Sequence, residues 1–197
     1  LNTQTEKTAQ LSFLKGIDHL LLQDLGAAIS ALTEAIERDP SFTLAYFARS
    51  IASLRRSEAE RGRPVEQSTP STPQVRAAAM GGKATTPAEL PLTAPTPTRV
   101  IEYSPLTDLN QVITQAPTFA FAYYNRANLY AKTGDVERAK QDYTKAIELN
   151  PLFAESYFNR GLLYYSEGKV KEGTRDLSRA GELGLYKAYS LIKRMNK

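Results

Sequence analysis

The sequence predicts an all-α protein, an α-solenoid of about four stacked antiparallel helix pairs with a C-terminal capping helix. Two similar phrases, "YYNRANLYAKTGD" at Tyr123 and "YFNRGLLYYSEGK" at Tyr157, begin 34 residues apart. Apolar residues recur within each phrase at spacings of three and four, which indicates amphipathic helices. A glycine interrupts each phrase and predicts a tight turn between two helices. One helix pair cannot bury its apolar face alone, so we expect neighbouring pairs to stack.

Small residues at fixed places support this arrangement. Ala127 and Gly161 occupy equivalent positions in the first helix of each pair, where they allow the second helix to approach closely. Ala146 and Ala180 do the same from the second helices. Pro151 follows a second helix and predicts its end.

The period, the small residues, the Gly134-Asp135 turn and the proline after the second helix resemble the tetratricopeptide repeat family, a helical repeat scaffold. The resemblance covers residues 120–184. It departs at Gly173, where the family prefers alanine, and this predicts a slightly looser helix. The resemblance implies a concave groove, lined by the first helices, that binds peptides or partner helices.

The same pattern extends towards the N-terminus. In the first repeat, Gln23 replaces the usual turn glycine and His19 replaces the usual aromatic residue. A further first helix begins at Thr43, and its partner reappears in "EYSPLTDLNQVITQAP", with Pro105 in its first turn. We therefore expect one array over 1–197 with these boundaries: 9–42 repeat 1, 43–118 repeat 2 with an insert at about 56–99, 119–152 repeat 3, 153–184 repeat 4, and 185–197 the capping helix.

Two segments have a composition unlike the repeats. The insert is rich in proline and threonine and lacks aromatic residues, which predicts a disordered or extended loop; a ligand for a proline-recognising domain is the alternative. In the C-terminal segment, Leu185, Ala188 and Ile192 fall on one helical face. That pattern predicts a cap for the exposed end of the array, and a membrane-surface helix is the alternative.

One position of the first helices is aromatic in all four repeats: Phe13, Phe47, Tyr124 and Phe158. One turn later, the equivalent residues are Ile17, Ile51, Asn128 and Leu162. Two interpretations stay open for this stripe. It packs successive repeats together, or it binds an apolar or helical partner, in which case Phe121, Glu155 and Tyr165 extend it.

Asn125 and Asn159 directly follow two of these aromatic residues. A side-chain amide offers both donors and an acceptor, which suits a peptide group. In related arrays asparagines at this place hold an extended peptide backbone; bonding to the neighbouring repeat is the alternative. Arg126 and Arg160 come next, and we expect each to form a salt bridge with an acid of its own or an adjacent repeat.

The variant of the family that clamps an acidic C-terminus uses Lys, Arg and Asn on successive first helices. The matching places here hold Phe13, Ile17 and Glu155, so recognition of a terminal carboxylate is disfavoured.

Several other functions are disfavoured by composition. The chain has no cysteine, and its single histidine, His19, is expected to pack among leucines in the core, so we expect no metal and no cofactor. GxxxxGK[ST], GxSxG and HExxH are absent, which argues against an enzyme. The excess positive charge falls in the insert and the tail, which disfavours nucleic-acid binding. No apolar run is long enough for direct membrane insertion.

The sequence therefore predicts a non-catalytic scaffold that binds a peptide or partner helix in its groove, and an accessory region of a larger enzyme or transport assembly is the alternative. The chain begins at Leu1 without a basic-then-apolar leader, so we expect a soluble mature product or a piece of a longer protein of open compartment. The predicted binding residues are Phe121, Tyr124, Asn125, Asn128, Glu155, Phe158, Asn159, Leu162 and Tyr165.

Overall fold

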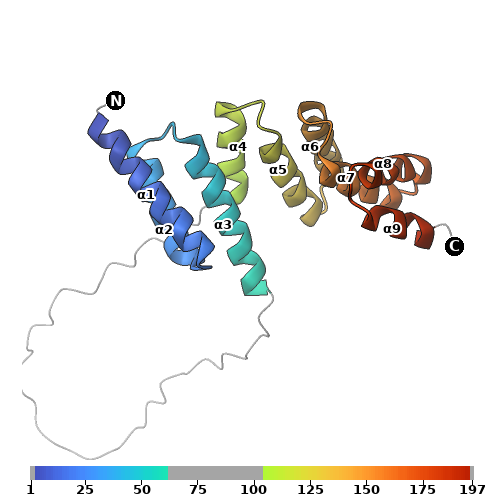
Figure 1. The fold of residues 1–197 in the computed structure, drawn as a ribbon, viewed down its shortest axis with the longest axis horizontal. Helices are drawn as coiled ribbons and strands as arrows, with labels where there is room; N and C mark the ends of the chain where they lie inside the picture. The colour runs from blue at the N-terminus through green and yellow to red at the C-terminus, as the bar shows by residue number, and fades with distance from the viewer. Residues whose placement is uncertain (1–2, 62–103, 196–197) are drawn as a thin grey trace, which may run out of the picture.

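The computed structural model describes residues 3–61 and 104–195. All regular structure within these residues is α-helical, and the helices follow one another along an elongated array with the two termini at opposite ends (Figure 1). The helices are α1 (Thr3–Leu21), α2 (Leu25–Arg38), α3 (Thr43–Arg61), α4 (Pro105–Gln115), α5 (Ala120–Lys132), α6 (Val136–Leu149), α7 (Ala154–Ser166), α8 (Val170–Glu182) and α9 (Lys187–Met195).

The described helices form four consecutive pairs, α1 with α2, α3 with α4, α5 with α6 and α7 with α8, and α9 packs on α8. This arrangement confirms the predicted α-solenoid. The first helix of each pair also touches the second helix of the preceding pair, so the apolar surface that a single pair leaves open is covered by its neighbour.

The turns within the pairs require a left-handed backbone. Gly134 and Gly168 adopt φ values of +82° and +76°, where glycine has no steric penalty. Asp135 follows and accepts a hydrogen bond from the Arg138 amide at 3.2 Å, which caps α6. Gln23 occupies the same turn in repeat 1 with φ +63°, so the replacement noted in the sequence keeps the backbone shape without a glycine.

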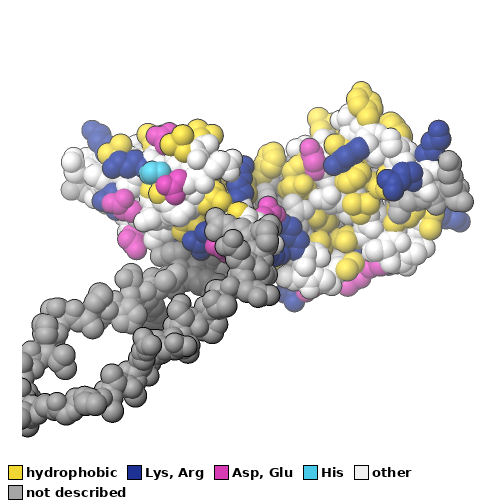
Figure 2. Space-filling view, turned by 90° about the horizontal axis from the view of Figure 1, so that it is seen from below, with side chains coloured by type: hydrophobic (Ala, Val, Ile, Leu, Met, Phe, Trp, Pro, Cys, Tyr) yellow, Lys and Arg dark blue, Asp and Glu magenta, His cyan; other side chains and the backbone are white. Residues whose placement is uncertain are grey.

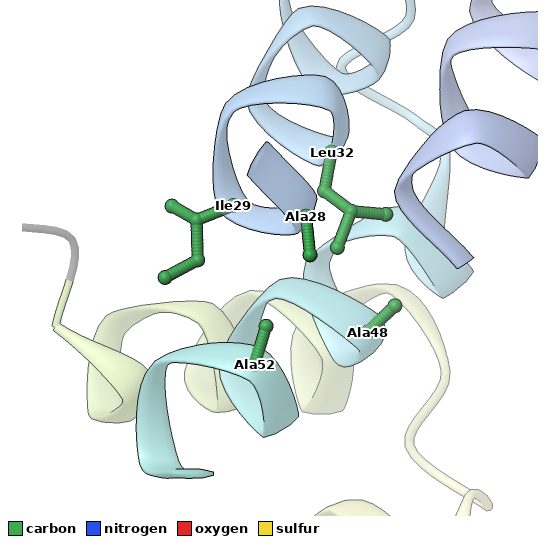
Figure 3. Close-up of a cluster of buried hydrophobic side chains, with 5 residues drawn as sticks. All are labelled: Ala28, Ile29, Leu32, Ala48 and Ala52. Atoms are coloured by element: carbon green, nitrogen blue, oxygen red, sulfur yellow. The ribbon is translucent and has the colours of Figure 1, made fainter. Parts of the chain in front are cut away.

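Small residues bring the helices into close contact, as the sequence predicts. In Figure 3, Ala28 and Leu32 of α2 point towards Ala48 and Ala52 of α3, and all four side chains are buried. At Gly161 of α7, an added Cβ atom would lie 3.1 Å from the Gly173 carbonyl oxygen of α8. The main chains of these two helices therefore meet without an intervening side chain.

Two expectations are corrected in repeats 1 and 2. Helix α3 continues to Arg61, so residues 56–61 are helical where the insert was expected to begin; the remainder, 62–99, lies outside the described residues. The charged run of α3 suits a helix as well as a loop, which is why composition misplaced this boundary. The His19 side chain is 41% exposed, since α1 ends two residues later. Its Nδ1 atom lies 3.9 Å from a carboxylate oxygen of Asp24. It is not a core residue.

The last helix closes the apolar end of the array. Ala188 of α9 is fully buried against Leu177 and Ala180 of α8, and Ile192 packs beside them. At Gly181, an added Cβ atom would lie 2.5 Å from the Tyr189 ring, so this glycine lets α9 lie close to α8.

Candidate functional site

The aromatic stripe of the first helices joins successive repeats. Three of its rings each contact a phenylalanine from the loop that precedes the first helix of the following repeat. The pairs, with centroid separations of 4.8, 5.0 and 4.7 Å, are Phe13–Phe42, Phe47–Phe119 and Tyr124–Phe153. These distances are those of packed aromatic side chains, so packing between repeats accounts for these three stripe residues.

The last stripe residue follows the same rule with a different partner. Lys187, which stands where the other repeats have the loop phenylalanine, places its Nζ atom 4.5 Å from the centre of the Phe158 ring. Phe121 differs from the stripe, since its side chain is 47% exposed although its ring lies 4.9 Å from that of Phe153. Glu155, at the equivalent place one repeat later, is also exposed.

In three of the four helix pairs, an arginine of the first helix forms a salt bridge with an aspartate of the second: Arg49 with Asp108, Arg126 with Asp142, and Arg160 with Asp176. Arg126 of α5 donates two hydrogen bonds to Asp142 of α6, at 2.7 and 2.8 Å, and a third to Asn110 of the preceding pair. Arg160 of α7 repeats this pattern with Asp176 of α8. The hydrogen bonds that Arg126 donates to Asp142 raise the pKa of Arg126. The salt bridges expected at these two arginines are confirmed.

A polar network crosses from repeat 3 to repeat 4. The hydroxyl group of Tyr143, a buried residue of α6, donates to the Asn128 Oδ1 atom at 2.6 Å. The Asn159 Nδ2 atom of α7 donates to the same oxygen at 3.0 Å and lies 3.5 Å from the Tyr124 hydroxyl oxygen. Asn159 therefore makes the inter-repeat bond that the sequence left as one of two alternatives.

Asn125 occupies the same repeat position but behaves differently. Its Nδ2 atom donates at 2.7 Å to the Phe121 carbonyl oxygen, one turn earlier in its own helix. The residues of repeat 2 that correspond to Tyr124 and Asn128 are Phe47 and Ile51, which have no polar side-chain atom. For this reason, the preceding repeat offers Asn125 no counterpart of the Tyr124 hydroxyl group or the Asn128 amide that Asn159 contacts.

Two cavities flank α5 on the face formed by α3, α5 and α7, which we call the inner face. The α3–α5 cavity has a volume of about 280 Å³ and the α5–α7 cavity about 360 Å³. The first is lined by Ile51, Leu54, Arg55, Glu58, Asn125, Asn128, Leu129 and Lys132. The second is lined by Asn128, Ala131, Lys132, Tyr143, Asn159, Leu162 and Leu163. Asn128 and Lys132 belong to both.

The α5–α7 cavity has a clear origin in the sequence. Ala131 stands in repeat 3 where Tyr165 stands in repeat 4. The Tyr165 ring lies over Gly173 of α8, and its hydroxyl oxygen is 2.5 Å from Thr174 Oγ1. Ala131 has only a methyl group at this position and lines the α5–α7 cavity. Gly173 thus makes room for a ring from the partner helix, where the sequence predicted only a looser helix.

The edge of both cavities carries charge. Lys132 of α5 forms a hydrogen-bonded ion pair with Glu58 of α3, a residue of the helical extension that the sequence assigned to the insert. The hydrogen bond and charge of Lys132 lower the pKa of Glu58, and Arg61 and Arg55 add smaller effects. Seen from below (Figure 2), basic and acidic side chains lie side by side near the middle of the array.

The structure brings some of the predicted site residues together. Asn128, Asn159 and Leu162 line the α5–α7 cavity, and Asn125 lines its neighbour. The lining of these two cavities does not include Phe121, Tyr124, Glu155, Phe158 or Tyr165. Sequence reasoning missed Ala131 and Lys132. One repeat position changes in size from Leu54 to Ala131 to Tyr165, and the small residue in the middle is the signal that could have indicated the α5–α7 cavity.

The described residues contain no group of three or more His, Cys, Asp or Glu side chains placed to hold a metal ion. None of the described helices combines the length and apolar character needed to cross a membrane.

Sequence models of the tetratricopeptide repeat match residues 13–74, 120–153 and 142–174. These stretches together span more than half of the 197 residues. The chain belongs to the tetratricopeptide repeat family. The four helix pairs are therefore tetratricopeptide repeats, and the inner face is formed by their first helices. No significant match was found among curated protein sequences.

Solved structures of other tetratricopeptide repeat arrays have the same fold. MamA is 16% identical over 94% of this chain and 79% of its own, with a TM-score of 0.67. A tetratricopeptide repeat protein from Parabacteroides merdae is 16% identical over 96% of this chain and 60% of its own, with a TM-score of 0.65. The first repeat domain of Spaghetti, bound to an HSP90 peptide, is 15% identical over 83% and 95%, with a TM-score of 0.57.

Proposed function

We propose that the inner face binds a peptide segment of another protein and that the chain acts as a non-catalytic interaction scaffold. The observation that carries this proposal is the pair of cavities beside α5, which combine apolar walls with side-chain amides. Binding sites commonly combine apolar walls with a few placed polar groups in this way. The Spaghetti domain, which holds a peptide on a similar fold, adds support.

The amides of the α5–α7 cavity retain unused bonding capacity. Asn128 Oδ1 accepts two hydrogen bonds, whereas its Nδ2 atom has no partner among the described residues. Asn159 donates through Nδ2, and its Oδ1 atom likewise has no partner within the described ranges. One donor and one acceptor side by side complement the C=O and N–H groups of a peptide. Asn128 and Asn159 can thus bond both each other and a ligand backbone.

An accessory region of a larger enzyme or transport assembly remains the alternative function. It would use the same inner face and differ in what the rest of the polypeptide does.

The test is to fill the α5–α7 cavity and measure peptide binding. Peptides are first selected from a random library displayed on phage, using the whole chain as bait. Ala131→Tyr should then weaken binding of a selected peptide at least about tenfold, because Ala139 stands where Gly173 makes room for Tyr165 and the new ring must enter the cavity.

Lys145→Tyr is the matched control, since it places the same ring on an exposed position of α6 outside both cavities. Both variants are compared by thermal unfolding, so that a loss of folding is recognised. Selected peptides that bind Ala131→Tyr and the unaltered protein equally well would refute the proposal, as would a library that yields no binder.

A further inference from the structure

We propose that the inner face selects a segment in the polyproline II conformation, with two large apolar side chains three residues apart and an acidic residue between them. This inference rests on the proposed function and specifies the peptide. It follows from the position of the two cavities on either side of α5, the unused amide atoms beside them and the charge at their common edge.

The spacing follows from the position of α5 between the two cavities. The two cavities lie on either side of α5 and share Asn128 and Lys132, so a chain that fills both must cross the width of one helix, about 10 Å with its side chains. Polyproline II rises about 3.1 Å per residue with three residues per turn, so residues i and i+3 are about 9.3 Å apart on one side. In a β-strand, residues i and i+3 point to opposite faces and cannot both enter. The apolar walls, formed by Ile51 and Leu54 on one side and Leu162 and Leu163 on the other, suit large aliphatic side chains.

The amide atoms distinguish this conformation from a helix. An α-helical partner with apolar residues seven apart would span about 10.5 Å, which also fits the spacing. Its backbone groups, however, are already bonded to one another and cannot use Asn128 Nδ2 or Asn159 Oδ1. Polyproline II has no internal hydrogen bonds, so its C=O and N–H groups are available to both amides.

The charge follows from the groups around Glu58. Lys132, Arg55 and Arg61 surround this one carboxylate, so the local charge is positive. Lys132 lies at the edge of both cavities, close to the part of a ligand that passes over α5. A carboxylate on the ligand between its two apolar residues would therefore meet an excess of cations.

Four capped synthetic peptides test the proposal by NMR titration of the whole chain, read at the side-chain amides of Asn128 and Asn159. They are "PPLPDLPP", its spacing isomer "PPLPLDPP", the neutral "PPLPNLPP" and the basic "PPLPKLPP". We expect the first to bind at least about tenfold more tightly than its isomer, since only it fills both cavities. The neutral peptide should bind about threefold to tenfold more weakly than the first, and the basic one more weakly still.

Lys132→Gln should reduce the preference for the acidic over the neutral peptide, and Lys145→Gln, on the exposed side of α6, should leave it unchanged. Equal binding of the two spacing isomers overturns the proposal, as does a phage selection dominated by helical sequences with apolar residues seven apart. In both cases peptide binding itself stands. If no peptide shifts the inner-face amides and the library yields none, the proposed function fails as well.

Discussion

The Arg49 guanidinium donates two hydrogen bonds to the Asp108 carboxylate, at 2.9 and 2.7 Å, although Asp108 comes 59 residues later in the chain. The equivalent pair of the next repeat, Arg126 and Asp142, is separated by only 16 residues. Repeat 2 thus holds 43 additional residues, 59 minus 16, between helices that dock in the usual register. The stacked array tolerates this because closing a longer loop costs free energy only logarithmically.

Breaking the Arg49–Asp108 pair should destabilise the protein strongly, because both side chains are buried, at 6% and 2% exposure. We expect Asp108→Ala to lower the free energy of unfolding by about 3–5 kcal/mol, since it removes the buried carboxylate that accepts two hydrogen bonds from the Arg49 guanidinium. The double variant Arg49→Met/Asp108→Leu should recover most of this loss. Urea denaturation measures all three proteins. A double variant no more stable than Asp108→Ala would contradict this account.

Gln23→Gly should stabilise the first repeat. Gln23 has φ +63°, a conformation that costs a residue with a side chain about 1–2 kcal/mol. Glycine removes this cost, but it also gives the unfolded chain more conformational freedom, which offsets part of the benefit. We therefore expect the free energy of unfolding to rise by about 0.5–1 kcal/mol. Gly134→Ala, at φ +82° with open space around it, should lose a similar amount in the same urea measurement. Unchanged stability of both variants would show that these turns relax.

Gly173→Ala should cost less stability when the Tyr165 ring is absent. In the unaltered protein, the new Cβ atom would collide with the Tyr165 ring and lie 3.0 Å from the Gly161 carbonyl oxygen, so we expect lower stability. With Tyr165→Ala present, the ring is gone and only the contact with the Gly161 carbonyl oxygen remains, which the helix preference of alanine, about 1 kcal/mol over glycine, opposes, so we expect a smaller loss. Thermal unfolding of the unaltered protein, the two single variants and the double variant provides the test. Additive effects would mean that the ring does not rest on Gly173.

Tyr143 should make stability depend on pH in the alkaline range. Burial raises the pKa of Tyr143 above its ordinary value of 10.0, so the folded protein holds this proton more tightly than the unfolded chain. The resulting stability is fully present below about pH 10 and is lost as the pH rises above that value. We expect Tyr143→Phe to show a shallower decline of the free energy of unfolding between about pH 10 and 12. Parallel declines in the two proteins would disprove the assignment.

Local signals were sufficient for the helix pairs. The recurrence of Tyr123 at Tyr157, the turn glycines and Pro151 each act within a few residues, through helical periodicity and backbone preference. Arg126 was also assigned correctly to a salt bridge, because its neighbours repeat with it at a fixed interval.

The boundary of α3 and the environment of His19 were not predictable in this way. A charged helix end and a charged loop have the same composition, and the ion pair between Glu58 and Lys132 joins residues that are 74 positions apart in the sequence. His19 has leucine neighbours in the sequence, yet the end of α1 leaves its ring half exposed.

The sequence by itself determined the repeat, the pairing of the helices and the positions at which small residues let them touch, because these depend on periodicities within 34 residues. Only the tertiary structure decided that Asn159 reaches the preceding repeat whereas Asn125 bonds its own helix, and that Ala131 lines a cavity whereas Tyr165 packs on Gly173 one repeat later. The reason is physical. A repeat position specifies where a side chain starts, but its partners come from the neighbouring helices, whose residues differ from one repeat to the next.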